Sequence, residues 1–512
     1  MPEALPLPKE KLLPMPAVGA ALGMAISYYS YSFLINYKTG YYIILALIIA
    51  LIAVINFFRV VILFPGEKNK AFYKVSILVI AAALGMVLGI ASRRSVQDSP
   101  NFALETEKII AISGILKNDP RTLSGGSGFA NIRLFTSNAS GGISVSSSGT
   151  VMVFFPSECI PRLKEFGRGA EIYMDGSLSQ KNDSWLFSAS SVHVLKPASA
   201  LEQTRTSMRM KLLEKFQMRQ DGKYSDSSAP VWGGLASALL FGMRDDLDVD
   251  LSQGFRDSGC AHILALSGMH LAILSGVLAF LLKRPLGLRG ASLAGAVFVI
   301  VYVFIADSQP SLIRSAIMYF IGAFSLLGFL KRRPISLLCM AFIIQLVFQS
   351  ETGQTLSFIL SYLALAGILT LGETFRSLFR GRLPDIIGIS LSASLGAFIF
   401  TAPVMVFYFS ALRPIGIAAG LVIAPLSSLF MVLSLAALII SFLPSPLWSV
   451  IDFFLTQVYR LFELVVSLAS RFPVLQISNP VPVLIFSILF LALILFIHRK
   501  DYAHRSSIVS FD

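Results

Sequence analysis

The sequence predicts a polytopic α-helical membrane protein of about 12 spans, with a small extracytoplasmic all-β, OB-like domain inserted after the third span. Its composition is the first reason: 55% of the 512 residues are apolar and 14% are charged, against roughly 25% charged residues in an average soluble domain. Apolar stretches near the ~20 residues of a spanning helix recur along most of the chain. Between about residues 98 and 258 the chain is polar, which marks a soluble insertion.

The first membrane region, residues 1–97, contains three expected spans at about 16–36, 41–64 and 73–91. Lys9 and Lys11 precede the first span, Lys38 stands alone in the next loop, and Arg59 begins a cluster of cations in the loop after that. Because cytoplasmic loops carry an excess of Lys and Arg, the N-terminus is predicted to be cytoplasmic. The third span then delivers the chain to the outer side.

Residues 98–199 are expected to form the β domain, because they alternate short strand patterns with Gly, Ser and Asn clusters. Five strands are predicted, in segments 107–120, 128–139, 149–156, 168–179 and 185–195. An OB-fold is the leading interpretation of a five-stranded barrel of this size, and a fragment of a β-sandwich is the alternative. Between residues 100 and 199, nine Lys and Arg stand against eight Asp and Glu, which leaves this domain without an electrostatic nucleic-acid surface.

The segment 200–258 is predicted to hold a basic amphipathic helix and a linker. Lys211, Lys215 and Arg219 recur every four residues, whereas Met208 and Phe216 share another face. Two interpretations of this basic face stay open: it lies on lipid headgroups, or it contacts phosphates of DNA outside the membrane. A run of aspartates from Asp245 is weakly similar to a calcium loop, and helix capping is the preferred interpretation.

Residues 259–498 are expected to contain nine further spans and to be followed by a cytoplasmic tail at 499–512. Basic residues fall in alternate loops, which orients these spans and places the C-terminus inside. The segment 447–468 carries three charges, and an interfacial position is its alternative. The expected spans are at about 261–282, 290–306, 311–330, 335–349, 355–373, 386–409, 415–442, 447–468 and 482–497.

Cofactor chemistry is not indicated. The three cysteines show no CxxC spacing, with a Cys159–Cys260 bridge as a minor alternative, and the five histidines show no HxH or HExxH cluster. No phosphate-binding loop is present either. We therefore predict a protein that is not an enzyme and holds no metal and no cofactor. The net charge of +13 suits either lipid headgroups or a polyanion such as nucleic acid.

The most informative stretch is residues 239–276, where polar residues interrupt a membrane segment. It contains Gly242 and Arg244, then a Phe and a Gly at 255 and 259, and then the segment HILALSGMH from His262 to His270. This pattern resembles the signature of the ComEC competence channels. Ser311 with Arg314, and the Leu-Ser-Phe motif around Ser357, extend the resemblance over most of residues 230–440.

The resemblance implies a channel that moves single-stranded transforming DNA across the bacterial cytoplasmic membrane, with membrane lipid around it. An external DNA receptor, a cytosolic helicase-like ATPase and a separate nuclease are the implied partners. Many members continue into a metallo-β-lactamase-like domain, which is not expected here. The chain departs from the family pattern at a few positions, namely Met243, Ala272, Gln354 and Gly420.

Six residues are the predicted DNA path. Ser267 and Gly268 lie about eight residues into their span, hence ~12 Å deep, and a glycine at that depth favours a broken helix. His262 and His270 are expected at one lumen or, alternatively, as packing histidines. Arg314 either lines the path or reaches the outer headgroups. The full set is His262, Ser267, Gly268, His270, Arg314 and Ser357.

Two other functions fit the composition. A secondary transporter of a solute or lipid is the main alternative, although no inverted repeat is evident. A membrane-anchored binding module whose β domain does the work is the third interpretation.

Overall fold

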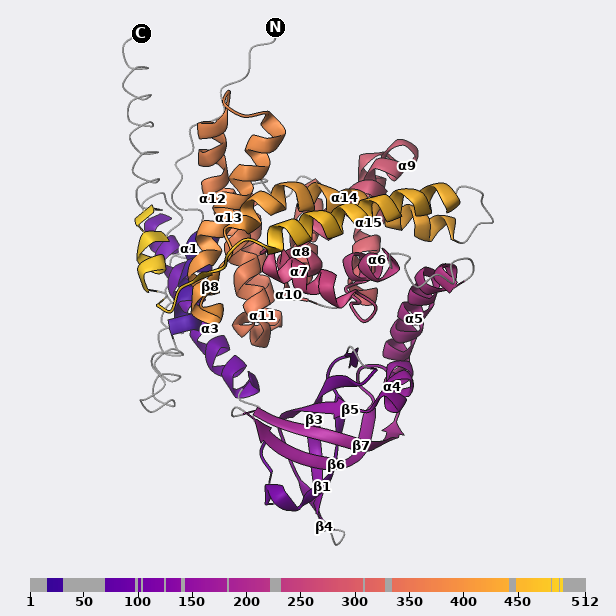
Figure 1. The fold of residues 1–512 in the computed structure, drawn as a ribbon. Coiled ribbons are helices and arrows are strands. Elements are labelled where there is room, and N and C mark those ends of the chain that lie inside the picture. The colour runs from indigo at the N-terminus through magenta and orange to yellow at the C-terminus, as the bar shows by residue number, and fades with distance from the viewer. Residues whose placement is uncertain are drawn as a thin grey trace, which may run out of the picture.

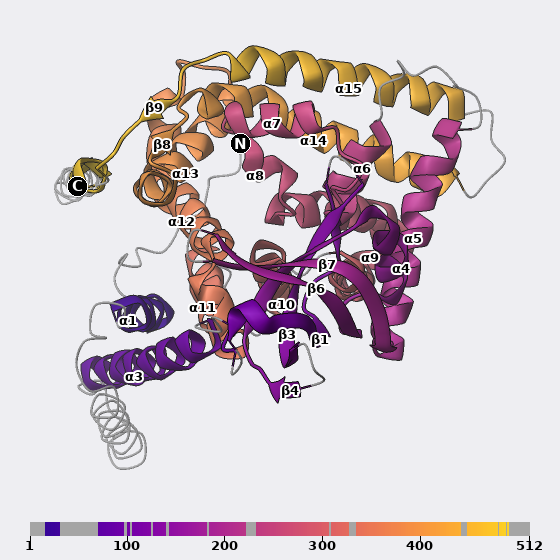
Figure 2. The ribbon, with the colours of Figure 1, turned by 60° about the horizontal axis from the view of Figure 1, so that its bottom comes forward.

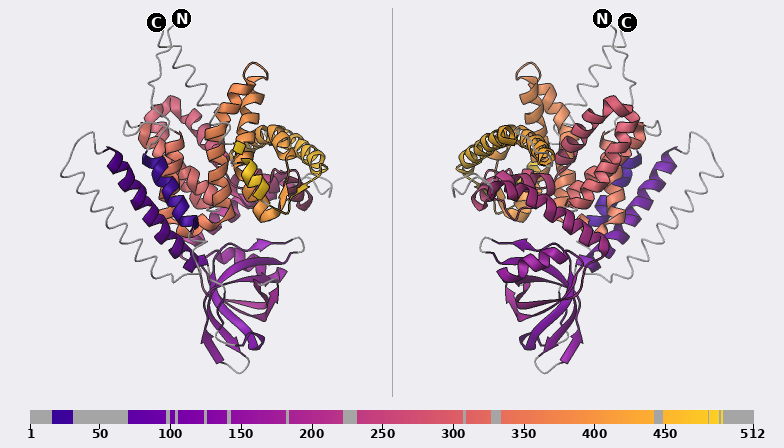
Figure 3. Two further views of the ribbon diagram at one scale, coloured as in Figure 1. Left: turned by 90° about the vertical axis from the view of Figure 1, so that its left-hand side faces the viewer. Right: turned by 90° about the vertical axis from the view of Figure 1, so that its right-hand side faces the viewer.

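The chain folds into a helical part and a β domain that projects from it (Figures 1 and 3). The computed structural model describes residues 16–30, 70–96, 100–102, 105–123, 126–139, 143–181, 184–221, 232–306, 309–326, 334–441, 448–479, 481–487 and 489–490. Everything below concerns these residues. The expected span at 41–64 and the tail at 499–512 lie outside them, and so does most of the expected span at 482–497.

Two N-terminal helices, α1 (Pro16–Ser30) and α3 (Lys70–Val96), pack closely against each other. Glycine permits the contact, because a Cβ at Gly85 would stand 2.4 Å from the carbonyl oxygen of Met24. Tyr28 and Tyr29 then donate hydrogen bonds of 2.5 and 2.7 Å to the carbonyls of Ser350 and Gly353 in the turn η4 (Ser350–Gln354). These bonds tie the N-terminal pair to the rest of the helical part.

The β domain is a closed barrel of five strands, which lie where the sequence patterns predicted them. The strand order is β1-β6-β7-β5-β3, and pairing of β1 with β3 closes the ring. All of these pairs are antiparallel except β5 with β7. The short helix α4 (Ile160–Phe166) connects β5 to β6. The strands are β1 (Ile109–Leu116), β3 (Gly128–Ala139), β5 (Thr150–Phe155), β6 (Glu171–Lys181) and β7 (Ser184–Lys196), with short β2 (Arg121–Thr122) and β4 (Ile143–Ser146) paired to β3.

The barrel interior is an apolar core, since alternate side chains of each strand point inward. Ala130, Ile132 and Leu134 of β3 are buried there with Val151 and Val153 of β5. The intervening residues of β3 face outward. This alternation of buried and outward-facing residues is the pattern from which the sequence predicts the strand.

Helix α5 (Ala200–Asp221) runs from the barrel back to the helical part (Figure 1). Leu213 and Phe216 on one of its faces join the core of the helical part, and α5 contacts α4, α6 and α9. The helix therefore bridges the two parts. Of the predicted apolar face, Phe216 is buried against protein, whereas Met208 is exposed.

The helical part contains four described helices that are long and apolar enough to cross a membrane, namely α9, α12, α13 and α14. The shorter α6 and α7 lie among them, although residues 200–258 were predicted to end in a linker. All ten residues of α6 are buried, so this segment belongs to the core. The helices are α6 (Trp232–Phe241), α7 (Val249–Asp257), α8 (Ala261–Leu264), α9 (Gly268–Ile305), α10 (Pro310–Leu326), α11 (Pro334–Phe348), α12 (Leu356–Phe379), α13 (Asp385–Phe409), α14 (Ile415–Ile440) and α15 (Trp448–Ser470), and β8 (Ala411–Leu412) pairs with β9 (Leu475–Gln476).

Helix α9 is interrupted at Gly287, whose φ of 66° and ψ of 179° are not helical, two residues after Pro285. Its two ends lie at the same level, because Gly268 packs against Ser315 and Ile305 is five residues before α10 begins. The 38-residue element therefore doubles back on itself. Its halves correspond to the two segments that the sequence predicted at 261–282 and 290–306.

Candidate functional site

The predicted break is centred on residues 265–267. Helix α8 ends at Leu264, Ala265 and Ser267 are extended, and α9 begins at Gly268. The start of α9 is fixed by His270, whose Nδ1 accepts hydrogen bonds from the backbone N–H of Ser267 (3.1 Å) and from its hydroxyl (2.9 Å). Because Nδ1 is the acceptor, the proton of the neutral ring lies on Nε2.

Gly268 allows α10 to approach the break. A Cβ at this position would stand 2.4 Å from Oγ of Ser315 and 3.2 Å from Nη2 of Arg314. Next to this contact, the hydroxyl of Ser311 donates to the carbonyl of Leu266 at 2.5 Å and satisfies a backbone group that the break exposes. The glycine thus serves close packing between α9 and α10 as well as the break itself.

Arg314 is buried at this junction, with 7% of its surface exposed. Its Nη1 donates to the carbonyl of Ser361 on α12, and its guanidinium carbon lies 5.7 Å from the centroid of the Tyr362 ring. The alternative in which this side chain reaches the outer headgroups is therefore wrong. No described acidic residue pairs with Arg314, which leaves its charge opposed only by a carbonyl and an aromatic face.

A chain of polar contacts continues from Tyr362 through α11. The hydroxyl of Tyr362 donates to Oε1 of Gln345 (2.8 Å), and Nε2 of Gln345 donates to the carbonyl of Pro310 (3.0 Å). Three buried atoms at the junction have no hydrogen-bond partner among the described residues: Nε2 of His270, Nε of Arg314 and Oγ of Ser361. Since a buried donor without a partner costs free energy, this junction is not optimised for stability alone.

The other two predicted path residues lie apart from this packed junction. His262 is exposed on α8, and Ser357 is exposed in the first turn of α12, one turn before Ser361. Both Figures 1 and 2 place α8 between α13 and α6. The two histidines therefore differ in surroundings, because His270 is fully buried.

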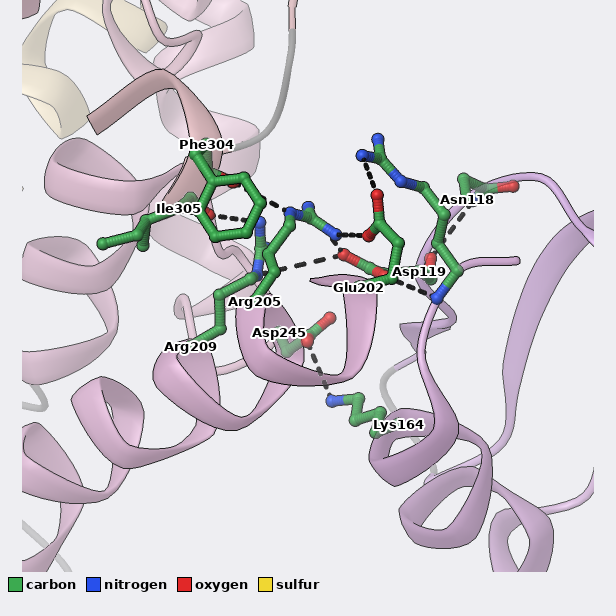
Figure 4. A network of polar contacts seen from close by, with 10 residues as sticks. Asn118, Asp119, Lys164, Glu202, Arg205, Arg209, Asp245, Phe304 and Ile305 are labelled. Atoms are coloured by element: carbon green, nitrogen blue, oxygen red, sulfur yellow. Dashed lines mark hydrogen bonds and ion pairs between the residues drawn. The ribbon is translucent and has the colours of Figure 1, made fainter. Parts of the chain in front are cut away.

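The basic residues of α5 fall into two groups that differ in their surroundings. Lys211 is exposed and Lys215 is half-buried, and the side chain of Arg219 lies outside the described residues. Arg205 and Arg209, on the same helix, have intramolecular partners instead (Figure 4). Arg205 is 1% exposed and pairs with Asp119 (3.1 Å) and Glu202 (3.2 Å).

The Arg205 cluster joins the barrel to the helical part. Nε of Arg205 donates to the carbonyl of Phe304 (3.1 Å), and Nη1 of Arg209 donates to that of Ile305 (3.1 Å), at the end of α9. Burial alone would raise the pKa of Asp119, but the Arg205 and Arg209 guanidinium groups together hold it below its usual value. We call Asp119, Glu202, Arg205 and Arg209 the domain joint; a second ion pair, Lys164 with Asp245 (2.8 Å), lies nearby.

Sequence reasoning missed two groups of residues. The domain joint was missed because its partners are far apart in the chain. The outward face of β3 was missed because its charge is balanced: Phe129, Arg133 and Phe135 lie on it, and the Phe129 ring is 6.2 Å from that of Phe154 on β5. Alternation of these residues with the buried ones is a signal that could have identified the face.

The structure also shows the state of two cysteines, the cap of α7 and the partner of Arg413. The thiols of Cys159 and Cys260 are free, so the minor alternative of a bridge is wrong. Asp248 accepts a hydrogen bond of 2.8 Å from the N–H of Leu251 and caps α7, which is the preferred capping interpretation. Arg413 pairs with Asp257 at 3.1 Å.

The fold and the site thus define an integral membrane protein. Its β-barrel is joined to a helical bundle that contains a broken helix. The chain belongs to the competence protein family, which matches residues 239–500. It is 26% identical over 198 residues to ComE operon protein 3 of Bacillus subtilis (strain 168), covering 38% of this chain and 24% of that protein. It is 30% identical over 239 residues to an uncharacterized protein of Aquifex aeolicus (strain VF5), covering 46% of this chain and 53% of that protein.

The chain therefore spans about half the length of the first relative it matches and about a quarter of the second. No solved structure matches it.

Proposed function

We propose that this protein is the channel through which single-stranded transforming DNA crosses the bacterial cytoplasmic membrane during natural competence. The observation that carries the proposal is the junction of the α9 break with Arg314. Irregular backbone and an unpaired cation inside a membrane bundle are costly, and they are retained where a substrate path needs them. A passing phosphodiester is the kind of anion that a guanidinium recognises.

Two exposed residues support a path beside this junction. His262 is exposed on α8 although that helix lies between α13 and α6, and Ser357 is exposed at the start of α12. The proposed path is lined by these two residues and opens past Ser267, Gly268, His270 and Arg314. Breaking a covalent bond is not part of the proposed activity.

We further propose that the barrel is an OB-fold that handles DNA outside the membrane. Its closed five-strand order, its one parallel pair and the position of α4 support that assignment. The outward face with Phe129, Phe135 and Phe154 offers rings on which bases stack, and Arg133 and Lys211 add cations for phosphates.

The proposed topology has about 12 spans with both termini in the cytoplasm. A cysteine at Ser190, in a Cys159→Ser background, is expected to react with a membrane-impermeant reagent in intact cells, because this residue is exposed on the barrel. A cysteine at Ser506 is expected to react only after lysis. Labelling of Ser506 in intact cells would remove one span from the proposal.

We assign the energy supply for DNA import and the removal of the second DNA strand to other proteins. Moving a polyanion toward a negative interior opposes the potential by ~2.3 kcal/mol per charge per 100 mV. A cytosolic helicase-like ATPase, an external DNA receptor and a separate nuclease are the proposed partners.

The decisive experiment is strand-specific uptake of labelled DNA by cells that carry this protein as their sole channel. Cytoplasmic single-stranded label is expected with the wild type and not with a null strain. Deleting residues 105–196 is expected to abolish uptake as well. Uptake that survives this deletion would contradict the external role of the barrel, and unchanged uptake in the null strain would contradict the channel.

A further inference from the structure

A groove of about 330 Å³ lies between the two halves of α9 and the end of α10. Its walls are made of small side chains, namely Ala279, Ala291, Gly322 and Ala323, and the hydroxyl of Tyr319 donates to the carbonyl of Ser292 (3.4 Å) at one side. Among the described residues that line the groove, Lys283 alone is charged. The groove exists because α9 doubles back at Gly287 and leaves its two arms to be bridged by α10.

The groove has free space and an apolar setting. A Cβ at Gly322 would meet no atom within 4 Å, so the wall there is open. Large apolar side chains next to it face outward, including Leu281 (59% exposed), Leu293 (66%) and Val297 (63%). Such exposure on a membrane helix faces hydrocarbon, and the groove therefore opens toward the lipid.

The rim of the groove carries positive charge that has no counter-charge among the residues that the structure describes. Arg284, next to Lys283, and Arg289, two residues after the interruption at Gly287, are both exposed, and none of the three pairs with a described acidic residue. Neither α9 nor α10 contains an Asp or Glu. Three more cations, at 331–333, follow α10 in the sequence. A neutral ligand would leave this charge uncompensated.

We propose that this groove binds one anionic phospholipid, with an acyl chain along the small side chains and the phosphate headgroup at Lys283, Arg284 and Arg289. An apolar groove with a cationic rim complements a molecule that has an apolar chain and an anionic head. Lys and Arg side chains near helix ends reach the headgroup level while their stems cover apolar surface. The site is independent of the DNA path, and nothing in the proposed function requires it.

The test is native mass spectrometry of the purified full-length protein with phosphatidylglycerol or with phosphatidylcholine of identical acyl chains. One phosphatidylglycerol is expected to be retained in preference to phosphatidylcholine. Lys283→Gln and Arg284→Gln each remove a surface cation, so each is expected to weaken phosphatidylglycerol binding about five-fold. Gly322→Leu fills the groove and is expected to reduce retention of both lipids.

The matched controls lie elsewhere in the chain. Arg380→Gln and Arg382→Gln remove exposed cations that do not line the groove, and Gly420→Leu adds bulk where a Cβ meets no atom within 4 Å. These variants are expected to retain phosphatidylglycerol as the wild type does. The proposal is overturned if the controls lose as much binding as Lys283→Gln, if both lipids bind equally to the wild type, or if Gly322→Leu leaves retention unchanged.

Discussion

Two buried arginines of this protein are held in opposite ways. Arg205, in the domain joint, is 1% exposed and has two carboxylates and a backbone carbonyl as partners. Arg314, inside the helical part, is 7% exposed and has a carbonyl and a tyrosine ring as partners, and its Nε has no hydrogen-bond partner among the residues that the structure describes.

Under the proposed function, the difference separates a structural role of Arg205 from a functional role of Arg314. A buried guanidinium whose charge is neutralised and whose donors are used fixes two domains relative to each other. A buried guanidinium without a carboxylate retains its charge for another anion. On this reasoning, a substitution of Arg205 mainly lowers stability, whereas a substitution at or near Arg314 mainly lowers transport.

The largest expected effect is at the α9 break. Gly268→Leu is expected to abolish DNA import, because its side chain would occupy the space of Ser315 and displace Arg314. Cytoplasmic label is measured beside surface-bound DNA and protein level, and external binding is expected to persist. Gly276→Leu is the control on the same helix, since a Cβ at Gly276 meets no atom within 4 Å. Normal import by a well-expressed Gly268→Leu variant would remove this segment from the path.

Replacement of Arg205 tests the structural half of the comparison. Arg205→Met leaves Asp119 without its closest cation, whereas Glu202 keeps its ion pair with Arg168 (2.7 Å). We expect a loss of stability of up to about 3 kcal/mol, at the low end for a broken buried pair because Asp119 is partly exposed. Thermal unfolding in detergent measures it. A neutral effect would mean that the domain joint is not what holds the barrel.

Replacement of Arg314 tests the functional half. Arg314→Met breaks no ion pair, so we expect a smaller loss of stability, about 1 kcal/mol, together with a loss of import that exceeds that of Arg205→Met. The same unfolding and uptake assays apply. The comparison fails if Arg314→Met unfolds the protein more readily than Arg205→Met does.

The domain joint is also expected to depend on pH. Because the folded-state pKa of Asp119 is lowered, its contribution to stability is present above the usual carboxyl pKa of about 3.9 and is lost as the pH falls through the folded-state value. Melting temperatures of the wild type and of Asp119→Asn are expected to differ near pH 7 and to converge on acidification. A constant difference down to pH 3 would exclude this linkage.

The smallest effect is expected on the exposed side of α5. If Lys211, Lys215 and Arg219 contact phosphates, replacing them with Gln is expected to lower the slope of log binding constant against log salt by ~0.7 for each lost contact with single-stranded DNA. Salt titrations of oligonucleotide binding measure this slope. An unchanged slope would favour the alternative of a contact with lipid headgroups.

Local features of this fold could be predicted from the sequence, and long-range ones could not. The five strands and the α9 break follow from alternation and from a glycine among polar residues. The role of Arg205 could not be predicted, because its partners Asp119 and Phe304 lie 86 and 99 residues away. Helix α6 was taken for a linker, since its ten residues are too few to span a bilayer.

The position of Phe304 in the chain also orders the assembly of the protein. Arg205 emerges from the ribosome 99 residues before the carbonyl that accepts its Nε proton. At roughly 5 to 20 residues per second, synthesis of that interval takes about 5 to 20 s. The barrel therefore has time to close before its attachment site exists, so that the final docking of the two parts joins an already folded domain to the last turn of α9.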